Sequence, residues 1–232
     1  MTVRCLCLAV ALCVVAPTAW AEWKGEVKLG FVATTGNTET TTLNFGLSVN
    51  NELERWRHRG RVEVVRATDT DETTVERYLF DYQANYRLHK WDYVFANLRY
   101  DRDLFSGFDY QVSETAGYGR EWKRGDKLTL ELQGGGGARQ SRPEEGENEN
   151  EAIVRGAFLL TWAFSKTAQL KQFLVIEDGE SNTVTESVTS LKSTIIGSLG
   201  MSFTLDIKRN SSVPPGSANT NSLTSVNLVY SF

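Results

Sequence analysis

The segment RYLFDYQANYRL, residues 77–88, alternates large apolar side chains with mostly polar ones. Successive side chains of a β-strand point to opposite faces, so a period of two puts the two sets on opposite faces of one strand. One face is then aromatic and aliphatic, and the other carries charges and amides. The apolar set is Tyr78, Phe80, Tyr82, Ala84, Tyr86 and Leu88, and the other set is Arg77, Leu79, Asp81, Gln83, Asn85 and Arg87.

The same alternation recurs along the chain, and no segment shows a convincing helical period. We therefore expect about twelve strands of about ten residues each, the length that a tilted membrane-spanning strand needs. The alternation is weak in residues 184–196, so a count of ten strands stays open. The expected strands lie near residues 27–33, 43–49, 56–66, 78–88, 93–101, 110–122, 128–137, 152–164, 168–177, 184–196, 201–209 and 222–232.

The first 21 residues have the features of a cleaved secretory leader. An apolar core, residues 5–15, follows the positive Arg4, and the Ala-Trp-Ala of residues 19–21 is a small-x-small cleavage site. The core is shorter than the roughly 18–20 residues that a membrane-anchoring helix needs. We expect the leader to be removed and residues 22–232 to form one exported domain.

The cysteine content, the net charge and the apolar runs limit the chemistry and the partners that the chain can have. All three cysteines, Cys5, Cys7 and Cys13, fall in the leader, so the mature chain has no disulfide or thiol chemistry. The full chain has 25 basic and 29 acidic residues, a formal charge of −4, and gives no reason to expect nucleic acid as a partner. Beyond the leader no apolar run is long enough for a membrane-spanning helix, so a spanning chain must form a closed barrel.

The connections between the expected strands fall into two alternating sets. Outer-membrane barrels have short periplasmic turns and longer outer loops, and an even number of strands puts both termini in the periplasm. The tight turn at Gly36-Asn37 is an exception on the outer side. The short set is 51–54, 89–92, 123–127, 165–167 and 197–200, and the longer set is 68–73, 102–109, 139–151, 178–183 and 210–221.

The chain ends with apolar residues at two-residue spacing and an aromatic residue in last place. Val226, Leu228, Tyr230 and Phe232 share one face of the expected final strand. This ending resembles the signal that the β-barrel assembly machinery reads, although an amphipathic edge strand of a soluble protein has the same alternation. Tryptophans near strand ends are typical of the aromatic girdles of membrane barrels. They are Trp23, Trp56, Trp91, Trp122 and Trp162.

These patterns together predict an all-β fold, an antiparallel transmembrane β-barrel with a lipid-facing apolar exterior and a polar lumen. We expect the bacterial outer membrane as its location. Its partners are then outer-membrane lipids and lipopolysaccharide, and the β-barrel assembly machinery during biogenesis. The sequence leaves the oligomeric state open.

Several segments resemble a known family, the outer-membrane proteins grouped as domain of unknown function 481 and also called salt-induced. The segments are TGNTET (35–40), YVFANLRYD (93–101) with Phe105 after it, GYGR (117–120), VPPG (213–216) and LVYSF (228–232), in the family's order. The resemblance covers most of the mature chain. It implies a small outer-membrane barrel, and it carries no established activity and no catalytic residue.

The side chains offer little for catalysis. His58 lies on an apolar strand face and His89 in a short turn, and neither is placed as a lipase or protease barrel requires. With no cysteine and no His-x-x-His or Glu-x-x-His pattern, we expect no catalytic residue, no metal site and no cofactor. The glutamates of residues 139–151 could bind divalent cations, but a solvated loop is the better interpretation. The glycine run 134–137 favours a bulge or a close approach of strands.

Charged residues gather on the polar face of the expected strands. Packed together they would form arginine–carboxylate pairs that plug a narrow barrel, which is the interpretation we favour. The other interpretation is a narrow pore whose basic wall favours small anions. The residues expected to line the lumen are Arg57, Arg59, Arg61, Arg77, Asp81, Arg87, Arg99, Asp101 and Glu131.

The sequence thus predicts a non-enzymatic outer-membrane barrel with a structural or salt-stress role and at most weak small-solute pore activity. Two alternatives stay open. One is a barrel enzyme that modifies lipid or lipopolysaccharide, which rests only on the precedent of small enzymatic barrels. The other is a soluble periplasmic binding barrel of lipocalin type, which would turn its apolar face inward.

Overall fold

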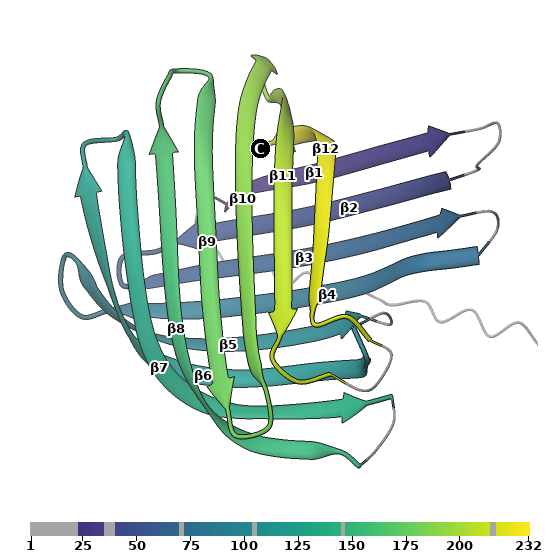
Figure 1. Ribbon diagram of the computed structural model, residues 1–232. Helices are drawn as coiled ribbons and strands as arrows, with labels where there is room; N and C mark the ends of the chain where they lie inside the picture. Colours follow the sequence, from purple (N-terminus) through teal and green to yellow (C-terminus); the bar gives the residue numbers. More distant parts are fainter. Residues whose placement is uncertain (1–22, 35–39, 70–71, 104–105, 145–146, 214–216) are drawn as a thin grey trace, which may run out of the picture.

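A computed structural model describes residues 23–34, 40–69, 72–103, 106–144, 147–213 and 217–232. Twelve antiparallel strands form one closed barrel in which each strand pairs with its neighbours in sequence and β1 pairs with β12 (Figure 1). The expected leader and the Gly36-Asn37 turn lie outside the described residues. The strands are β1 (Trp23–Thr34), β2 (Thr40–Glu52), β3 (Trp56–Asp69), β4 (Glu72–Arg87), β5 (Asp92–Asp103), β6 (Phe108–Arg124), β7 (Leu128–Pro143), β8 (Glu149–Ala163), β9 (Ala168–Gly179), β10 (Thr183–Ile196), β11 (Leu199–Asn210) and β12 (Thr220–Ser231).

The described residues form twelve strands, which decides between the two counts that the sequence left open. β10, the strand with weak alternation, pairs along its length with β9 and β11, so it is a full member of the barrel. We call the end where β1 begins and β12 ends the terminal end, and the opposite end the loop end. No helix long and apolar enough to cross a membrane occurs in the described residues.

The expectation of long connections at the loop end is wrong for most of them. Residues 139–151 illustrate the reason, because β7 continues to Pro143 and β8 begins at Glu149. Arg139 and Glu151 lie opposite each other in the β7–β8 ladder, and their side chains form an ion pair of 2.6 Å. Polar cross-strand pairs of this kind let the ladder continue. Of these connections, the one between β11 and β12 stays long.

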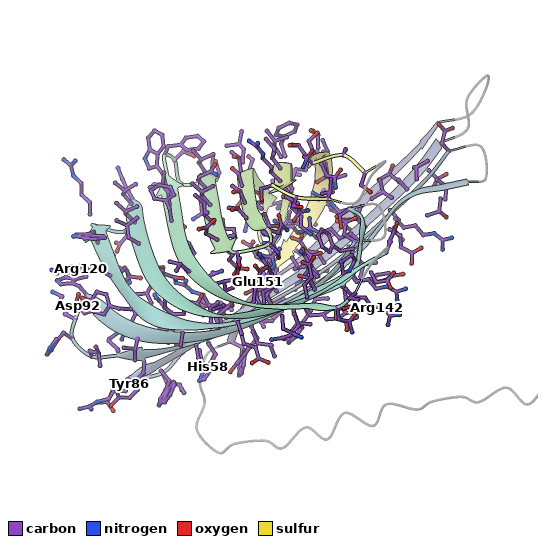
Figure 2. The ribbon with its side chains drawn as sticks, turned by 60° about the horizontal axis from the view of Figure 1, so that its bottom comes forward. His58, Tyr86, Asp92, Arg120, Arg142 and Glu151 are labelled. Carbon is purple, nitrogen blue, oxygen red and sulfur yellow. The ribbon has the colours of Figure 1, made fainter. Side chains whose placement is uncertain are left out.

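The apolar side chains face outward and the charged ones inward. Tyr82 and Leu228 are 39% and 48% exposed on the outer surface, whereas Arg99 and Asp101 are 7% and 4% exposed inside the barrel. Figure 2 shows His58 and Tyr86 on the outer side of the wall. A soluble binding barrel would need the opposite arrangement, so the predicted orientation is confirmed and the lipocalin-type alternative is contradicted.

The glycines of β7 allow β6 and β7 to approach closely. A Cβ atom added at Gly137 would lie 1.8 Å from the backbone oxygen of Glu114, and one at Gly135 would lie 2.3 Å from the backbone oxygen of Ala116. The ladder runs through residues 134–137 without a register shift. The run therefore serves close strand approach rather than a bulge.

The seam between the first and last strands is short. Within the described residues β1 pairs with β12 over four positions, from Glu26–Ser231 to Leu29–Leu228, whereas β1 and β2 pair over their whole length. At Gly30 the two strands still touch, since an added Cβ atom would lie 2.4 Å from Asn227 Oδ1. From there toward the loop end, β1 and β12 diverge (Figure 1).

Aromatic residues cluster on the outside of the terminal end. Each predicted tryptophan lies at the start or end of a strand or in a turn on this side. Trp56 stacks on His58, and His58 stacks on Tyr82 and forms a 2.8 Å hydrogen bond with its hydroxyl group. His58 is thus part of an exterior aromatic cluster at one rim, where amphipathic rings fit a membrane–water boundary.

Candidate functional site

The barrel interior holds the most connected group of charged side chains. Arg77 on β4 contacts three carboxylates: Asp101 on the next strand at 3.1 Å, and Glu186 and Asp206 at 3.1 and 2.8 Å. Glu186 lies on β10 and Asp206 on β11, several strands away around the barrel. One guanidinium group therefore ties two separate arcs of the wall together across the lumen.

Three more contacts complete this group. Arg99 lies 2.6 Å from Glu186 and 3.1 Å from Asp101, and Lys208 lies 3.0 Å from Asp101. Three cations thus balance three carboxylates, as buried charges require. We call this set the central network. Its members are Arg77, Arg99, Asp101, Glu186, Asp206 and Lys208.

A second network fills the interior near the terminal end. Arg57 lies 2.6 Å from Glu121 and 3.0 Å from Glu131, and its guanidinium group lies 5.1 Å from the centre of the Tyr93 ring. Tyr93 donates a 2.8 Å hydrogen bond to Glu131, which also pairs with Arg59. We call Arg57, Arg59, Tyr93, Glu121 and Glu131 the lower network.

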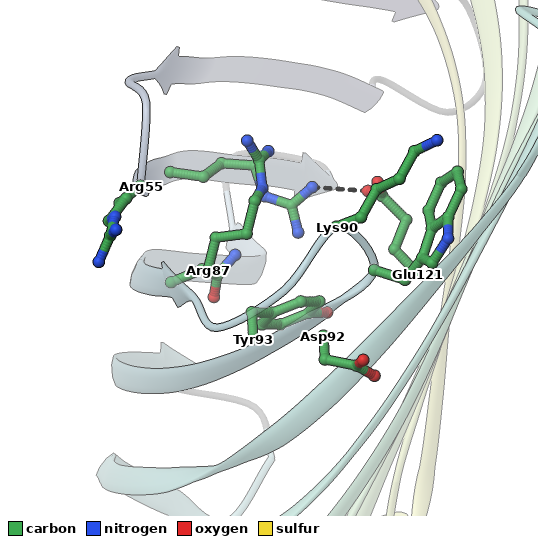
Figure 3. A pocket seen from close by; sticks show the side chains of 9 residues that line it. Arg55, Arg87, Lys90, Asp92, Tyr93 and Glu121 are labelled. Carbon is green, nitrogen blue, oxygen red and sulfur yellow. Dashed lines mark hydrogen bonds and ion pairs between the residues drawn. The ribbon is translucent and has the colours of Figure 1, made fainter.

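The rim beside the lower network is narrow. A pocket of about 10 Å³ lies there, lined by Arg57 and Glu121, which form an ion pair. Figure 3 shows this pocket from close by. Arg87, predicted to line the lumen, lies at this rim and pairs with Glu52 at 2.8 Å. In the β2–β3 turn, a hydrogen bond from Arg55 to the Tyr86 hydroxyl group raises the pKa of the Arg55 guanidinium. The pocket has room for no more than a water molecule.

The predicted lumen residues lie in different parts of the barrel interior. Arg57, Arg59 and Glu131 belong to the lower network, and Arg77, Arg99 and Asp101 belong to the central network. Arg61 pairs mainly with Glu63 on its own strand at 2.8 Å and lies 3.8 Å from Glu186, and Asp81 lies 4.0 Å from Arg99. The arginines therefore do not form an uncompensated basic wall that would favour anions, because carboxylates pair with them and neutralise their charge.

Sequence reasoning missed half of the central network. Glu186 lies on β10, where the outward-facing residues are less regularly apolar, and Asp206 and Lys208 lie on the regularly alternating β11. Two further pairs near the loop end were also missed, Arg139–Glu151 and Arg155–Glu177 at 2.7 Å. The alternation of the strands could have revealed them, because Glu186 and Asp206 occupy the alternate positions whose side chains face the lumen.

Beside the networks the interior is partly open. A cavity of about 810 Å³, here called the vestibule, occupies the terminal half of the barrel along β1–β3 and β7–β10. Lys28, Arg59 and Glu63 line it on one side, and Leu159 and Phe173 on the other. Two smaller cavities of about 20 and 160 Å³ lie further toward the loop end.

No described residues form a group of three His, Cys, Asp or Glu side chains suited to a metal ion. The four residues of the predicted assembly signal, Val226, Leu228, Tyr230 and Phe232, are exposed on the outer face of the last strand and the chain end. The backbone of Phe232 pairs with Gly25 through hydrogen bonds of 2.8 and 2.9 Å, so the last residue also closes the seam.

A closed barrel with an apolar exterior and a charged interior defines a porin-like barrel of the outer-membrane type. A solved NanC porin shares the fold, with a TM-score of 0.51 and 11% identity over 89% of this chain and 97% of that one. An outer membrane channel from Pseudomonas putida F1 gives a TM-score of 0.46 and 12% identity over 94% and 100% of the two chains.

The chain belongs to the family described as protein of unknown function, DUF481, whose model matches residues 27–232. The family resemblance seen in the sequence is thereby confirmed. A relative is the uncharacterized protein YdiY of Escherichia coli (strain K12), which is 24% identical over 218 residues, 92% of this chain and 85% of that protein.

Proposed function

We propose that this protein is an outer-membrane barrel with a structural, salt-stress-related role, and that its interior excludes sugar-sized solutes. The central network carries this proposal, because it joins β4 and β5 to β10 and β11 across the lumen. Long side chains that pair across a barrel of this strand number leave little room for solute. The terminal end would face the periplasm, with residues 1–21 removed as a leader.

The burial of the network supports the salt-stress part of the proposal. At an ionic strength of about 1 M, charges in water are screened beyond about 3 Å, whereas buried pairs are screened much less. Glu186 is fully buried and Asp101 nearly so. A wall cross-braced by such pairs should keep its shape as external salt rises. Surface pairs such as Arg142–Asp109, at 3.1 Å, should weaken.

Two measurements test the proposal. Cells expressing the whole chain should yield it in the outer-membrane fraction, with a gel mobility that changes on boiling as for other closed barrels. Liposomes carrying the purified protein should not swell in isotonic glucose or arabinose, whereas liposomes carrying an open porin should swell. Recovery in the soluble periplasm would contradict the location, and swelling comparable to the porin would contradict the closed interior.

A further inference from the structure

We propose that a narrow passage for small inorganic anions runs through the barrel beside the central network, and that Lys28 selects the ions. The passage rests on the proposed function only in requiring a membrane-inserted barrel. It would follow the wall formed by β1–β3 and β11–β12. It borders both networks, because Arg59 lines the vestibule and Asp206 and Lys208 line the cavity nearest the loop end.

Three cavities in line mark the passage. The vestibule shares Lys28, Arg61, Glu63 and Val188 with the next cavity, of about 20 Å³, which we call the neck. The neck shares Val65, Asp206 and Leu223 with the outer cavity of about 160 Å³ near the loop end. The three cavities therefore adjoin one another in sequence along the barrel, as a continuous route would require, and the neck has the smallest volume of the three.

A missing side chain creates the neck. Lys28, Gly46 and Glu63 lie side by side in the ladders of β1, β2 and β3, and Gly46 is the middle member. A Cβ atom added at Gly46 would lie 3.5 Å from Lys28 Cβ, an ordinary contact, so the space beside it is bounded by the stem of Lys28. The volume of the neck suits about one water molecule. Passage of an ion would therefore require the flexible ends of Lys28 or Arg61 to move.

The charge balance of the neck gives the selectivity. Arg61 is paired with Glu63, and Asp206 is paired with Arg77. Lys28 forms no ion pair within 4.0 Å with any residue that the structure describes. Amide and hydroxyl groups of Asn44, Thr204, Ser225 and Asn227 surround the neck and can solvate an ion. The ammonium group of Lys28 is attracted by nearby Glu63 and Glu26 but has no close ion pair, whereas the other charges of the neck are paired. This arrangement favours a small anion such as chloride.

The test is planar-bilayer recording of the purified protein in asymmetric KCl. We expect small, discrete conductance steps with a reversal potential displaced toward that of chloride. Lys28→Gln should lower the ratio of chloride to potassium permeability by about threefold or more, and Lys28→Glu should invert the preference. Lys127→Gln is the matched control, because Lys127 is exposed in the β6–β7 turn and outside all three cavities.

A second pair of variants tests the route itself. Gly46→Leu should place a side chain in the neck and abolish the steps, whereas Gly46→Ala makes only an ordinary contact and should leave most of the conductance. Heat-modifiable mobility confirms that each variant is folded. Absence of steps in the wild-type protein would overturn the passage, and so would unchanged selectivity in Lys28→Glu or unchanged conductance in Gly46→Leu. Outer-membrane location and exclusion of sugars are measured separately and would survive any of these results.

Discussion

Glu186 shows how much one side chain can hold together in this barrel. It is fully buried and contacts Arg77 and Arg99 from the opposite arc of the wall. Without it, three cations of the central network would share two carboxylates. Buried charges that lose a partner are costly because neither water nor another ion replaces it.

We therefore expect Glu186→Gln to lower the free energy of unfolding by about 3 kcal/mol or more. Urea unfolding of the protein in lipid vesicles, followed by tryptophan fluorescence, measures the change. Glu180→Gln, in the exposed β9–β10 turn, is the control and should be nearly neutral. Equal stability of the Glu186→Gln variant and the wild type would mean that the network fills space without bracing the wall.

At the scale of the element, β7 combines a membrane-spanning strand with an unusually close neighbour. The inward glycines Gly135 and Gly137 let the backbone of β6 approach, and Gly134 faces open space. The sequence could indicate a close approach, but it could not say which of the four glycines was needed. That depends on the bend of the strand, which arises from barrel closure rather than from local sequence.

The difference in crowding between Gly137 and Gly134 gives a prediction in which one position is the control for the other. Gly137→Ala should destabilise the barrel by about 1–3 kcal/mol, because the new methyl group would collide with backbone that cannot rotate away. Gly134→Ala adds the same group where nothing lies within 4 Å and should cost little. Urea unfolding of both variants provides the comparison. Similar losses at the two positions would contradict crowding against β6 as the cause, because reduced flexibility of the unfolded chain would stabilise both variants.

The last strand and chain end carry a second prediction at this scale. Phe232→Ala should reduce the amount of folded barrel in the outer membrane severalfold if the assembly machinery reads the final aromatic residue. Refolding into detergent, which needs no machinery, should change much less. Phe203→Ala, another exposed aromatic on neighbouring β11, is the control. Equal losses in cells and in detergent would assign Phe232 a purely structural role at the seam, where its ring lies against Gly25.

At the scale of the molecule, alternation in the sequence was enough to predict the class of fold and the orientation of the two faces. It left the count open between ten and twelve strands, which the pairing of β10 with β9 and β11 decides. Residues 77–88 already indicate the orientation, because Tyr82 must face outward if Asp81 faces inward. The pairing of charges across the lumen was not accessible. Arg77 meets Glu186 only because twelve strands close with a particular stagger, and no local pattern fixes that stagger.

The sequence could not predict the passage or the short connections at the loop end for the same reason, because both depend on which residues pair across strands. Gly46 is an unremarkable glycine in sequence, and it becomes a gap only when Lys28 and Glu63 lie on either side of it. The polar residues after 138 look like a loop because strand signals are read from apolar alternation. Their ladder is held by pairs such as Arg139–Glu151, whose partners are twelve positions apart.

Because β1 and β12 pair over only four ladder positions, part of the wall has backbone groups that no neighbouring strand pairs with. In the described structure, residues from Thr220 to Asn227 pair with β11 on one side and have no ladder to β1 on the other. Amides on that side should exchange with deuterium sooner than those of β11, which is bonded on both sides. Exchange followed by mass spectrometry would reveal this, and equal protection along both strands would mean that the gap closes in a bilayer.

Unpaired backbone is expensive in hydrocarbon, so the slit between these strands cannot simply face lipid tails. Water held there, lipid headgroups drawn down into it, or an extended peptide from outside would each satisfy the exposed groups. The wall is therefore weakest along this slit, because β1 and β12 can separate sideways by losing only their four ladder pairs and the Gly25–Phe232 hydrogen bonds at the terminal end.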